Sequence, residues 1–190
     1  MRALACLALL LLAHTARAEE TPWGLVRLMA QLQAVKQARA HFIERKTATM
    51  LTAPVESTGT LSYVAPDRLE KITLTPAPES IVLQGDMLAG VQPNGDKFSV
   101  SLSDHPEVAA LVEGVRSTMA GDIETLGRYY AIDFSGHPSE WRLVLTPLDR
   151  SVRDKVDAIR ISGEGTELKT VSVHETDGDQ SEMTVTPDVP

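Results

Sequence analysis

The feature that most constrains the fold is a series of short segments in which apolar and polar residues alternate. Alternation with a period of two places apolar side chains on one face of a strand. Breaks such as Pro76-Ala77-Pro78, Gly85-Asp86 and Asn94-Gly95-Asp96 separate the segments and mark turns. Closely spaced strands with such turns form an antiparallel meander. The pattern predicts about eleven strands, at 42–51, 55–64, 68–75, 79–84, 87–92, 97–102, 131–135, 141–146, 156–162, 168–175 and 181–186.

Two helical regions accompany these strands. Apolar residues three and four apart predict an amphipathic helix over 22–40, with Thr21-Pro22 at its start. A second region is inserted after the sixth strand, where Asp104 and Glu107 resemble a capping box. A short further helix is expected after Gly121-Asp122. The apolar faces of the two longer helices consist of Leu28, Met29 and Leu32 in the first and Leu111, Val115 and Met119 in the second.

The N-terminus has the three parts of a secretory signal peptide. Met1-Arg2 is basic, residues 3–13 are apolar, and Ala16-Arg17-Ala18 offers a small-x-small cleavage site. The apolar run is shorter than the roughly 20 residues that a spanning helix needs. We therefore expect a signal peptide at 1–18 and one exported domain at 19–190.

Composition argues against several classes of function. The net charge is −8, and both nucleic acids and anionic membranes prefer basic partners. The single cysteine, Cys6, lies in the predicted signal peptide, so the mature domain has no disulfide. No nucleophile or phosphate-loop motif is present, and His41, His105, His137 and His174 are not spaced as metal ligands. We expect a monomer that is not an enzyme and needs neither a metal ion nor a cofactor.

The apolar faces of the strands suggest a curved sheet. Aromatic residues make up only 4% of the chain, too few for two equal packed layers of so many strands. A strongly curved, unclosed antiparallel barrel, covered by the N-terminal helix and the inserted helices as a lid, accommodates the count. The alternative is that the same residues fill a solid core. The predicted concave face consists of Leu61, Tyr63, Ile72, Leu74, Ile81, Leu83, Met87, Phe98, Val100, Leu143 and Leu145.

Four short motifs follow one another between about Trp23 and Val185. They are "FIERK" after the first helix, "GTLSYVAPDRL", "GDML" and "WRLVLTP". In this order they resemble the outer-membrane lipoprotein carriers of the LolA family. The resemblance implies a location in the periplasm and an unclosed β-barrel with a helical lid over a hydrophobic cavity. Two departures indicate a divergent branch. Ala65 stands where the carriers have an arginine that reaches toward the lid, and Glu70 stands where they have an aromatic residue. Arg68 is a candidate to replace the missing arginine.

The resemblance implies three possible functions. The first is a carrier that shields the acyl chains of lipoproteins between the inner and outer membranes. Its partners would be acylated lipoproteins, an inner-membrane release transporter and an outer-membrane acceptor. The second is a carrier of another lipid or polyene-type amphiphile that works with an inner-membrane exporter. The third is a binding module that senses lipids or proteins without transporting them.

Overall fold

A computed structural model describes residues 22–188 of the protein, so the predicted signal peptide at 1–18 lies outside the described residues. Eleven antiparallel strands form one sheet in the order β6-β5-β4-β3-β2-β1-β11-β10-β9-β8-β7. The strands are β1 (Gln37–Thr47), β2 (Val55–Val64), β3 (Arg68–Thr75), β4 (Glu79–Gln84), β5 (Met87–Val91), β6 (Lys97–Ser101), β7 (Tyr130–His137), β8 (Glu140–Pro147), β9 (Val156–Glu164), β10 (Glu167–Glu175) and β11 (Gln180–Pro187).

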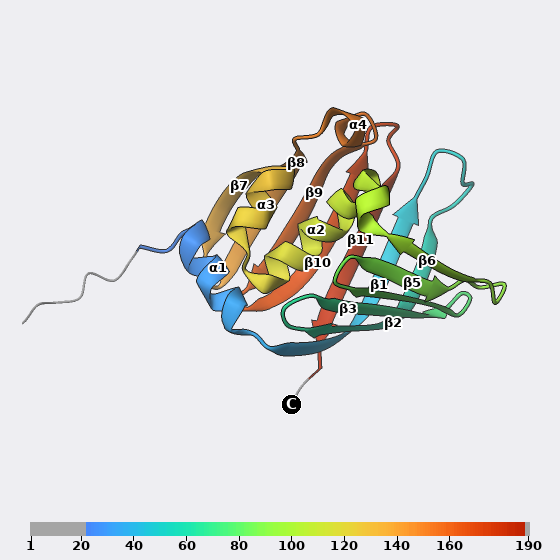
Figure 1. The fold of residues 1–190 in the computed structure, drawn as a ribbon, viewed down its shortest axis with the longest axis horizontal. Helices are drawn as coiled ribbons and strands as arrows, with labels where there is room; N and C mark the ends of the chain where they lie inside the picture. Colours follow the sequence, from blue (N-terminus) through green and yellow to red (C-terminus); the bar gives the residue numbers. More distant parts are fainter. Residues whose placement is uncertain (1–21, 189–190) are drawn as a thin grey trace, which may run out of the picture.

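The sheet curls without closing. Its two edge strands, β6 and β7, are not hydrogen-bonded to each other. In Figure 1 strands β7–β11 rise steeply, whereas β2–β6 run nearly across the view, so the sheet is strongly curved between its two halves. The predicted fold class, an unclosed and strongly curved antiparallel barrel of about eleven strands, is confirmed.

The helices lie on the concave side of this sheet (Figure 1). They are α1 (Leu25–Ala34), the 3₁₀ turn η1 (Leu102–Asp104), α2 (Pro106–Ala120), α3 (Ile123–Tyr129) and α4 (Arg150–Arg153). The predicted helical pair after the sixth strand corresponds to α2 and α3. Within residues 22–188, no helix combines the length and the apolar character needed to cross a membrane.

The boundary between the first helix and the first strand differs from the prediction. Helix α1 ends at Ala34, and strand β1 begins at Gln37, five residues earlier than expected. Alanine has a high helix propensity, so the alanines in 35–40 favour a helix in the sequence pattern. Instead, Ala38 and Ala40 are held in the sheet by pairing with Tyr63 and Leu61 of β2. The predicted capping box is also wrong, because Asp104 lies in η1 and α2 begins after His105 without a side-chain cap.

On its concave side, the half of the sheet that contains β8 and β9 is covered by closely packed side chains. Helix α1 packs Leu28, Met29 and Leu32 onto the inner face of β8 and β9 in a single buried cluster. The strand side of that cluster consists of Trp141, Leu143, Leu145, Ile159 and Ile161, all 0% exposed. The space under this half of the sheet is therefore filled by side chains.

The half of the sheet that contains β2 and β3 bends at Gly59. A Cβ atom at this position would lie 1.9 Å from the carbonyl oxygen of Ile72 and 2.7 Å from the ring of Phe42. The pairing of β2 with β3 also shifts register between Thr58 and Gly59. A bulge at a residue without a side chain increases the local bend of a strand. The ring of Phe42 fills the space that a side chain at 59 would need.

Candidate functional site

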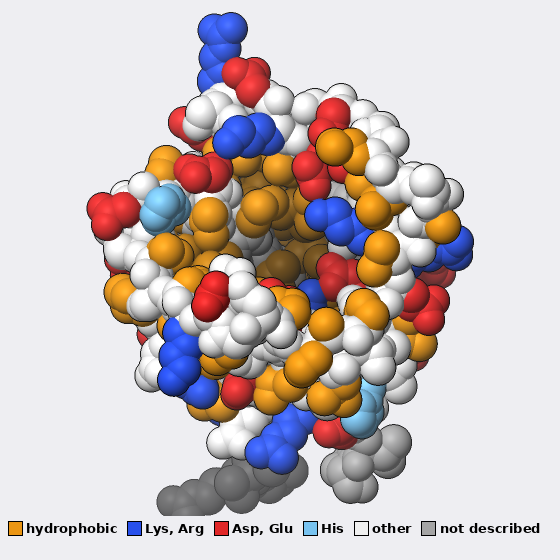
Figure 2. Space-filling model, turned by 90° about the vertical axis from the view of Figure 1, so that its right-hand side faces the viewer, with side chains coloured by type: hydrophobic (Ala, Val, Ile, Leu, Met, Phe, Trp, Pro, Cys, Tyr) orange, Lys and Arg blue, Asp and Glu red, His pale blue; other side chains and the backbone are white. Residues whose placement is uncertain are grey.

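An open hollow of about 830 Å³ lies between α2 and the strands of the other half of the sheet. Figure 2 looks onto the side where the β1–β2 and β5–β6 turns project in Figure 1, and it shows a depression with hydrophobic walls and charged side chains near its rim. The apolar lining comprises Val35, Ala38, Ala40, Leu61, Tyr63, Leu69, Ile81, Leu83, Leu88, Leu111, Val112, Val115, Met119, Leu168, Val171, Met183, Val185 and Pro187. We call this space the apolar hollow.

The structure brings several of the predicted site residues together in the apolar hollow. From the sheet come Leu61 and Tyr63 on β2 and Ile81 and Leu83 on β4, the two strands on either side of β3. From the predicted lid come Leu111, Val115 and Met119, along one face of α2. The hollow is therefore closed on one side by the inserted helix.

Other predicted lining residues lie elsewhere. In β3 the inward positions are Leu69 and Lys71, so Ile72 and Leu74 point outward and are exposed. Met87 is outward and exposed in the same way, because its neighbour Leu88 faces inward. Phe98 and Val100 pair with Gly90 and Leu88 near the sheet edge and are not among the lining residues.

The five remaining predicted residues fall in the solid half. Leu143 and Leu145 are fully buried in the cluster with α1, so they do not line the apolar hollow. Leu28, Met29 and Leu32, predicted as part of the lid, belong to the same cluster. Packing by α1 converts this part of the concave face into core.

Sequence reasoning missed much of the hollow's lining. Leu69 and Leu88 are paired with Tyr63 and Leu83, which were predicted to face inward, so strand register was the missing signal. Leu168, Val171, Met183 and Val185 come from β10 and β11, which the curvature of the sheet brings opposite β2 and β3. Only the three-dimensional path of the sheet places these strands at the hollow.

A charged cluster interrupts the apolar wall. The ammonium of Lys71 lies 5.0 Å from the centre of the Phe42 ring and forms an ion pair with the carboxylate of Glu44. Ser181 donates a hydrogen bond of 2.7 Å to Glu44, and Ser57 donates a longer one of 3.5 Å. Burial alone would raise the pKa of Glu44, but these donors outweigh it and hold the pKa below the usual 4.5.

This lowered pKa makes stability depend on pH. A carboxyl group whose folded pKa is depressed stabilises the fold above its unfolded pKa, and that contribution is lost as pH falls through the folded value. We expect the urea midpoint to fall below about pH 4.5, and Glu44→Gln to make the fall shallower. The pKa values of Asp122 and Asp149 are also lowered, but these residues contribute the same pH dependence to the wild-type protein and to Glu44→Gln. Identical pH profiles from pH 7 to 3 would contradict the assignment.

Helix α2 is fastened to the sheet on the side away from the apolar hollow. The guanidinium of Arg116 donates to the carbonyl oxygen of Gly85, in the β4–β5 turn, and to the carboxylate of Glu113. Ser117 donates a 2.9 Å hydrogen bond to the same carboxylate. The hydroxyl of Tyr130 donates to the carbonyl of Ala110, and burial raises the pKa of this tyrosine. Polar contacts thus anchor the lid helix at several points.

Comparison with known proteins identifies the family. A sequence profile described as "outer membrane lipoprotein carrier protein LolA-like" matches residues 13–186. The chain belongs to this LolA-like family. The resemblance predicted from four short motifs is confirmed across nearly the whole chain. No curated protein sequence matches significantly.

Several solved structures have a weak overall similarity to this chain. A LolA superfamily protein from Nitrosomonas europaea has 13% identity and a TM-score of 0.45, covering 86% of this chain and 94% of its own. A DUF1329 family protein from Desulfovibrio piger has 10% identity and a TM-score of 0.49, covering 87% and 91%. MucB of Pseudomonas aeruginosa, solved with MucA, has 10% identity and a TM-score of 0.43, covering 85% and 54%. The LolA-like chain thus spans about half the length of that neighbour.

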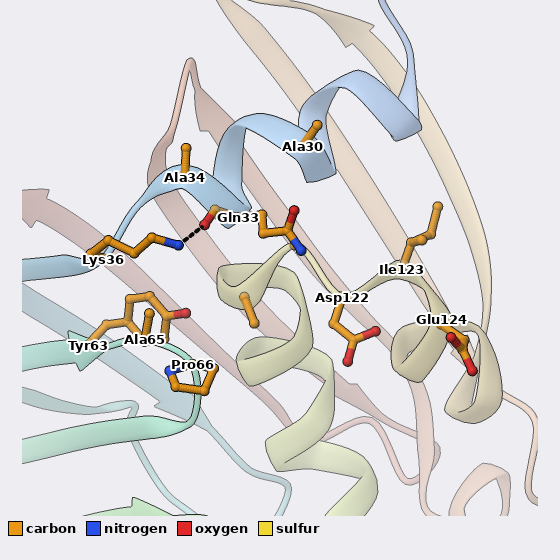
Figure 3. Close-up of a pocket in the computed structure, with 12 residues that line it drawn as sticks. Ala30, Gln33, Ala34, Lys36, Tyr63, Ala65, Pro66, Asp122, Ile123 and Glu124 are labelled. Atoms are coloured by element: carbon orange, nitrogen blue, oxygen red, sulfur yellow. Dashed lines mark hydrogen bonds between the residues drawn. The ribbon is translucent and has the colours of Figure 1, made fainter.

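A second opening in the LolA-like chain is lined in part by Ala65. Figure 3 shows Ala65 and Pro66 beside Tyr63, facing the junction of α2 and α3 across a cleft of about 670 Å³. The candidate replacement Arg68 donates to Gln84 and pairs with Glu70, so it contacts strands and not the lid. Arg116, which comes from the lid itself, does join lid and sheet through the carbonyl oxygen of Gly85.

Proposed function

We propose that this LolA-like chain is a periplasmic carrier that shields the acyl chains of lipoproteins during transfer from the inner to the outer membrane. The observation that supports this function is the apolar hollow between α2 and the curved sheet. Each methylene removed from water stabilises a complex by about 0.8 kcal/mol. A hollow lined by aliphatic side chains offers this gain without recognising a particular polar group.

The shape of the site suits release as well as binding. One wall is a helix that contacts the sheet through a limited set of side chains, and the hollow is open to solvent (Figure 2). Met119 and Met183 contribute flexible thioether side chains that adapt to chains of different shape. A carrier needs such an adaptable surface because it must pass its cargo to an acceptor.

A release experiment tests the proposed function directly. Mature protein is incubated with spheroplasts, recovered from the supernatant and analysed by mass spectrometry for molecules that copurify. We expect acylated proteins at close to one per carrier. Recovery of free lipids alone would favour carriage of another amphiphile, and recovery of the protein without any bound molecule would count against carriage.

A charge placed on the lid face of the hollow should abolish binding. Leu111 is 37% exposed on α2 and lines the apolar hollow, so Leu111→Glu should fold while placing a carboxylate against the cargo. We expect at least tenfold weaker binding of a fluorescent fatty-acid ester. The matched control is Val26→Glu on α1, where the side chain is 69% exposed and away from the hollow. Equal affinities of the two variants would contradict the location of the site.

A second candidate function is carriage of a different amphiphile. The specific observation in its favour is Lys71, whose charged side chain lies on the wall of a hollow that is otherwise mainly apolar. Acyl chains alone give no reason for a cation at this position.

A further inference from the structure

Lys71 reaches the apolar hollow from the middle of its wall. It is paired across the sheet with Leu61 on β2 and Ile81 on β4, and all three side chains line the hollow. Its side chain is 26% exposed. Burying a lysine in an apolar surface is unfavourable unless a partner compensates for lost hydration. The position of this cation therefore needs an explanation beyond strand packing.

The partners of Lys71 place its ammonium near one mouth of the hollow. Glu44 lies close to the end of β1, and Ser57 and Ser181 lie close to the starts of β2 and β11. These strand ends meet on the side where the β1–β2 turn projects (Figure 1). Figure 2, viewed from this side, shows basic and acidic side chains against the hydrophobic wall of the depression. The wall is therefore apolar inside and charged toward the mouth.

The ion pair leaves Lys71 capacity for another anion. A lysine ammonium has three donors, and the carboxylate of Glu44 accepts from it. Glu44 in turn accepts from Ser57 and Ser181, so it keeps two donors if Lys71 moves toward a ligand. The ring of Phe42 lies beneath the ammonium and stabilises its charge.

The other charged residues near the hollow differ from Lys71 in their direction or in their ion-pair partners. Arg39 and Glu70 are also among the lining residues, but they alternate along their strands with the inward residues Ala38, Ala40, Leu69 and Lys71. Arg39 is exposed, and Glu70 pairs with Arg68. Glu167 pairs with Lys169 at 2.6 Å, and Asp188 pairs with His41 at 3.4 Å near the end of the described chain. Lys71 differs from these residues because its strand position, between Leu61 and Ile81, points inward from the wall of the sheet.

We propose that Lys71 binds the anionic head group of an amphiphile whose hydrocarbon chain lies in the apolar hollow. The ligand class is a long-chain molecule ending in a carboxylate or phosphate, and Glu44 holds the lysine in place when the hollow is empty. The inference rests on the proposed binding of acyl chains but not on the cargo being a lipoprotein. An ammonium that pairs with an anionic oxygen at the mouth orients the chain inward.

The test compares two probes that have the same hydrocarbon chain, one with an anionic head group and one with a neutral head group. Cis-parinaric acid and its methyl ester are titrated into the mature protein and followed by fluorescence. A charge-assisted hydrogen bond at a partly exposed site gives the acid about tenfold tighter binding than the ester. Lys71→Met should remove this preference by weakening acid binding to the level of the ester. Lys71→Arg should keep it, because a guanidinium retains the positive charge.

Two further variants serve as controls. Lys155→Met removes an exposed lysine outside the lining of the hollow and should retain the tenfold preference. Glu44→Gln removes the competing carboxylate and should strengthen acid binding several-fold. Competition by lysophosphatidic acid against a neutral monoacylglycerol distinguishes a phosphate head group from a carboxylate.

The outcomes separate this inference from the proposed function. Equal affinity of the wild-type protein for acid and ester would overturn the head-group site and leave acyl-chain binding intact. A Lys71→Met protein that loses affinity for both probes alike would show that the lysine only supports the fold. Binding of neither probe would overturn the proposed function and the head-group site with it.

Discussion

Leu143→Ala is expected to lower the free energy of unfolding by about 3 kcal/mol while changing the affinity for a fatty-acid ester less than twofold. Leu143 is 0% exposed and packs in the cluster that α1 forms with β8 and β9. Truncating a buried leucine removes apolar contacts and leaves a cavity, which costs about 2–5 kcal/mol. Urea unfolding gives the stability, and fluorescence titration with methyl parinarate gives the affinity.

Leu61→Ala provides the contrasting variant. Leu61 is only partly buried and faces the apolar hollow, so its truncation creates little new cavity in the fold. We expect a loss of stability below about 1 kcal/mol, together with several-fold weaker ester binding because part of the wall is removed. If Leu143→Ala weakened binding and Leu61→Ala did not, the ligand would bind beside Leu143, and the assignment of the apolar hollow as the binding site would be wrong.

The strands and their order of appearance were predictable because alternation and turn residues are local signals. Ten of the eleven strands begin within one residue of the predicted positions, and the helical insert falls after the sixth strand as expected. The exception is β1, where alanines in 35–40 fit a helix as well as a strand. Pairing with β2 and β11 on both sides decides between them, and such pairing is not visible in the local pattern.

The candidate site was harder to predict because a strand's alternation does not state which face is inside. In β3 the apolar residues Ile72 and Leu74 face solvent, whereas the charged Lys71 faces the hollow. Hydrophobicity alone therefore selects the wrong face of this strand. Whether an inward residue lines a hollow or fills a core depends on where α1 lies, since it covers Leu143 and Leu145 but not Leu61.

The attachment of the lid gives the second large expected effect. Arg116→Met removes the donor to the Gly85 carbonyl and leaves the buried Glu113 carboxylate with Ser117 as its remaining donor. Removing one partner of a buried ion pair is costly because the other charge stays in a poorly hydrated site. We expect the free energy of unfolding to fall by about 3 kcal/mol, as measured by urea unfolding. Loading of methyl parinarate, followed by stopped-flow fluorescence, should be faster than in the wild-type protein.

A double variant separates the two roles of this arginine. In Glu113→Leu/Arg116→Met no charge remains buried, so most of the lost stability should return. The contact with Gly85 is still absent, so faster loading should persist if that contact restrains α2. Arg128→Met removes an exposed ion pair with Glu124 on α3 and should change neither quantity measurably. Loading of the double variant at the wild-type rate would mean that Arg116 serves only to neutralise Glu113, and that other contacts hold the helix over the hollow.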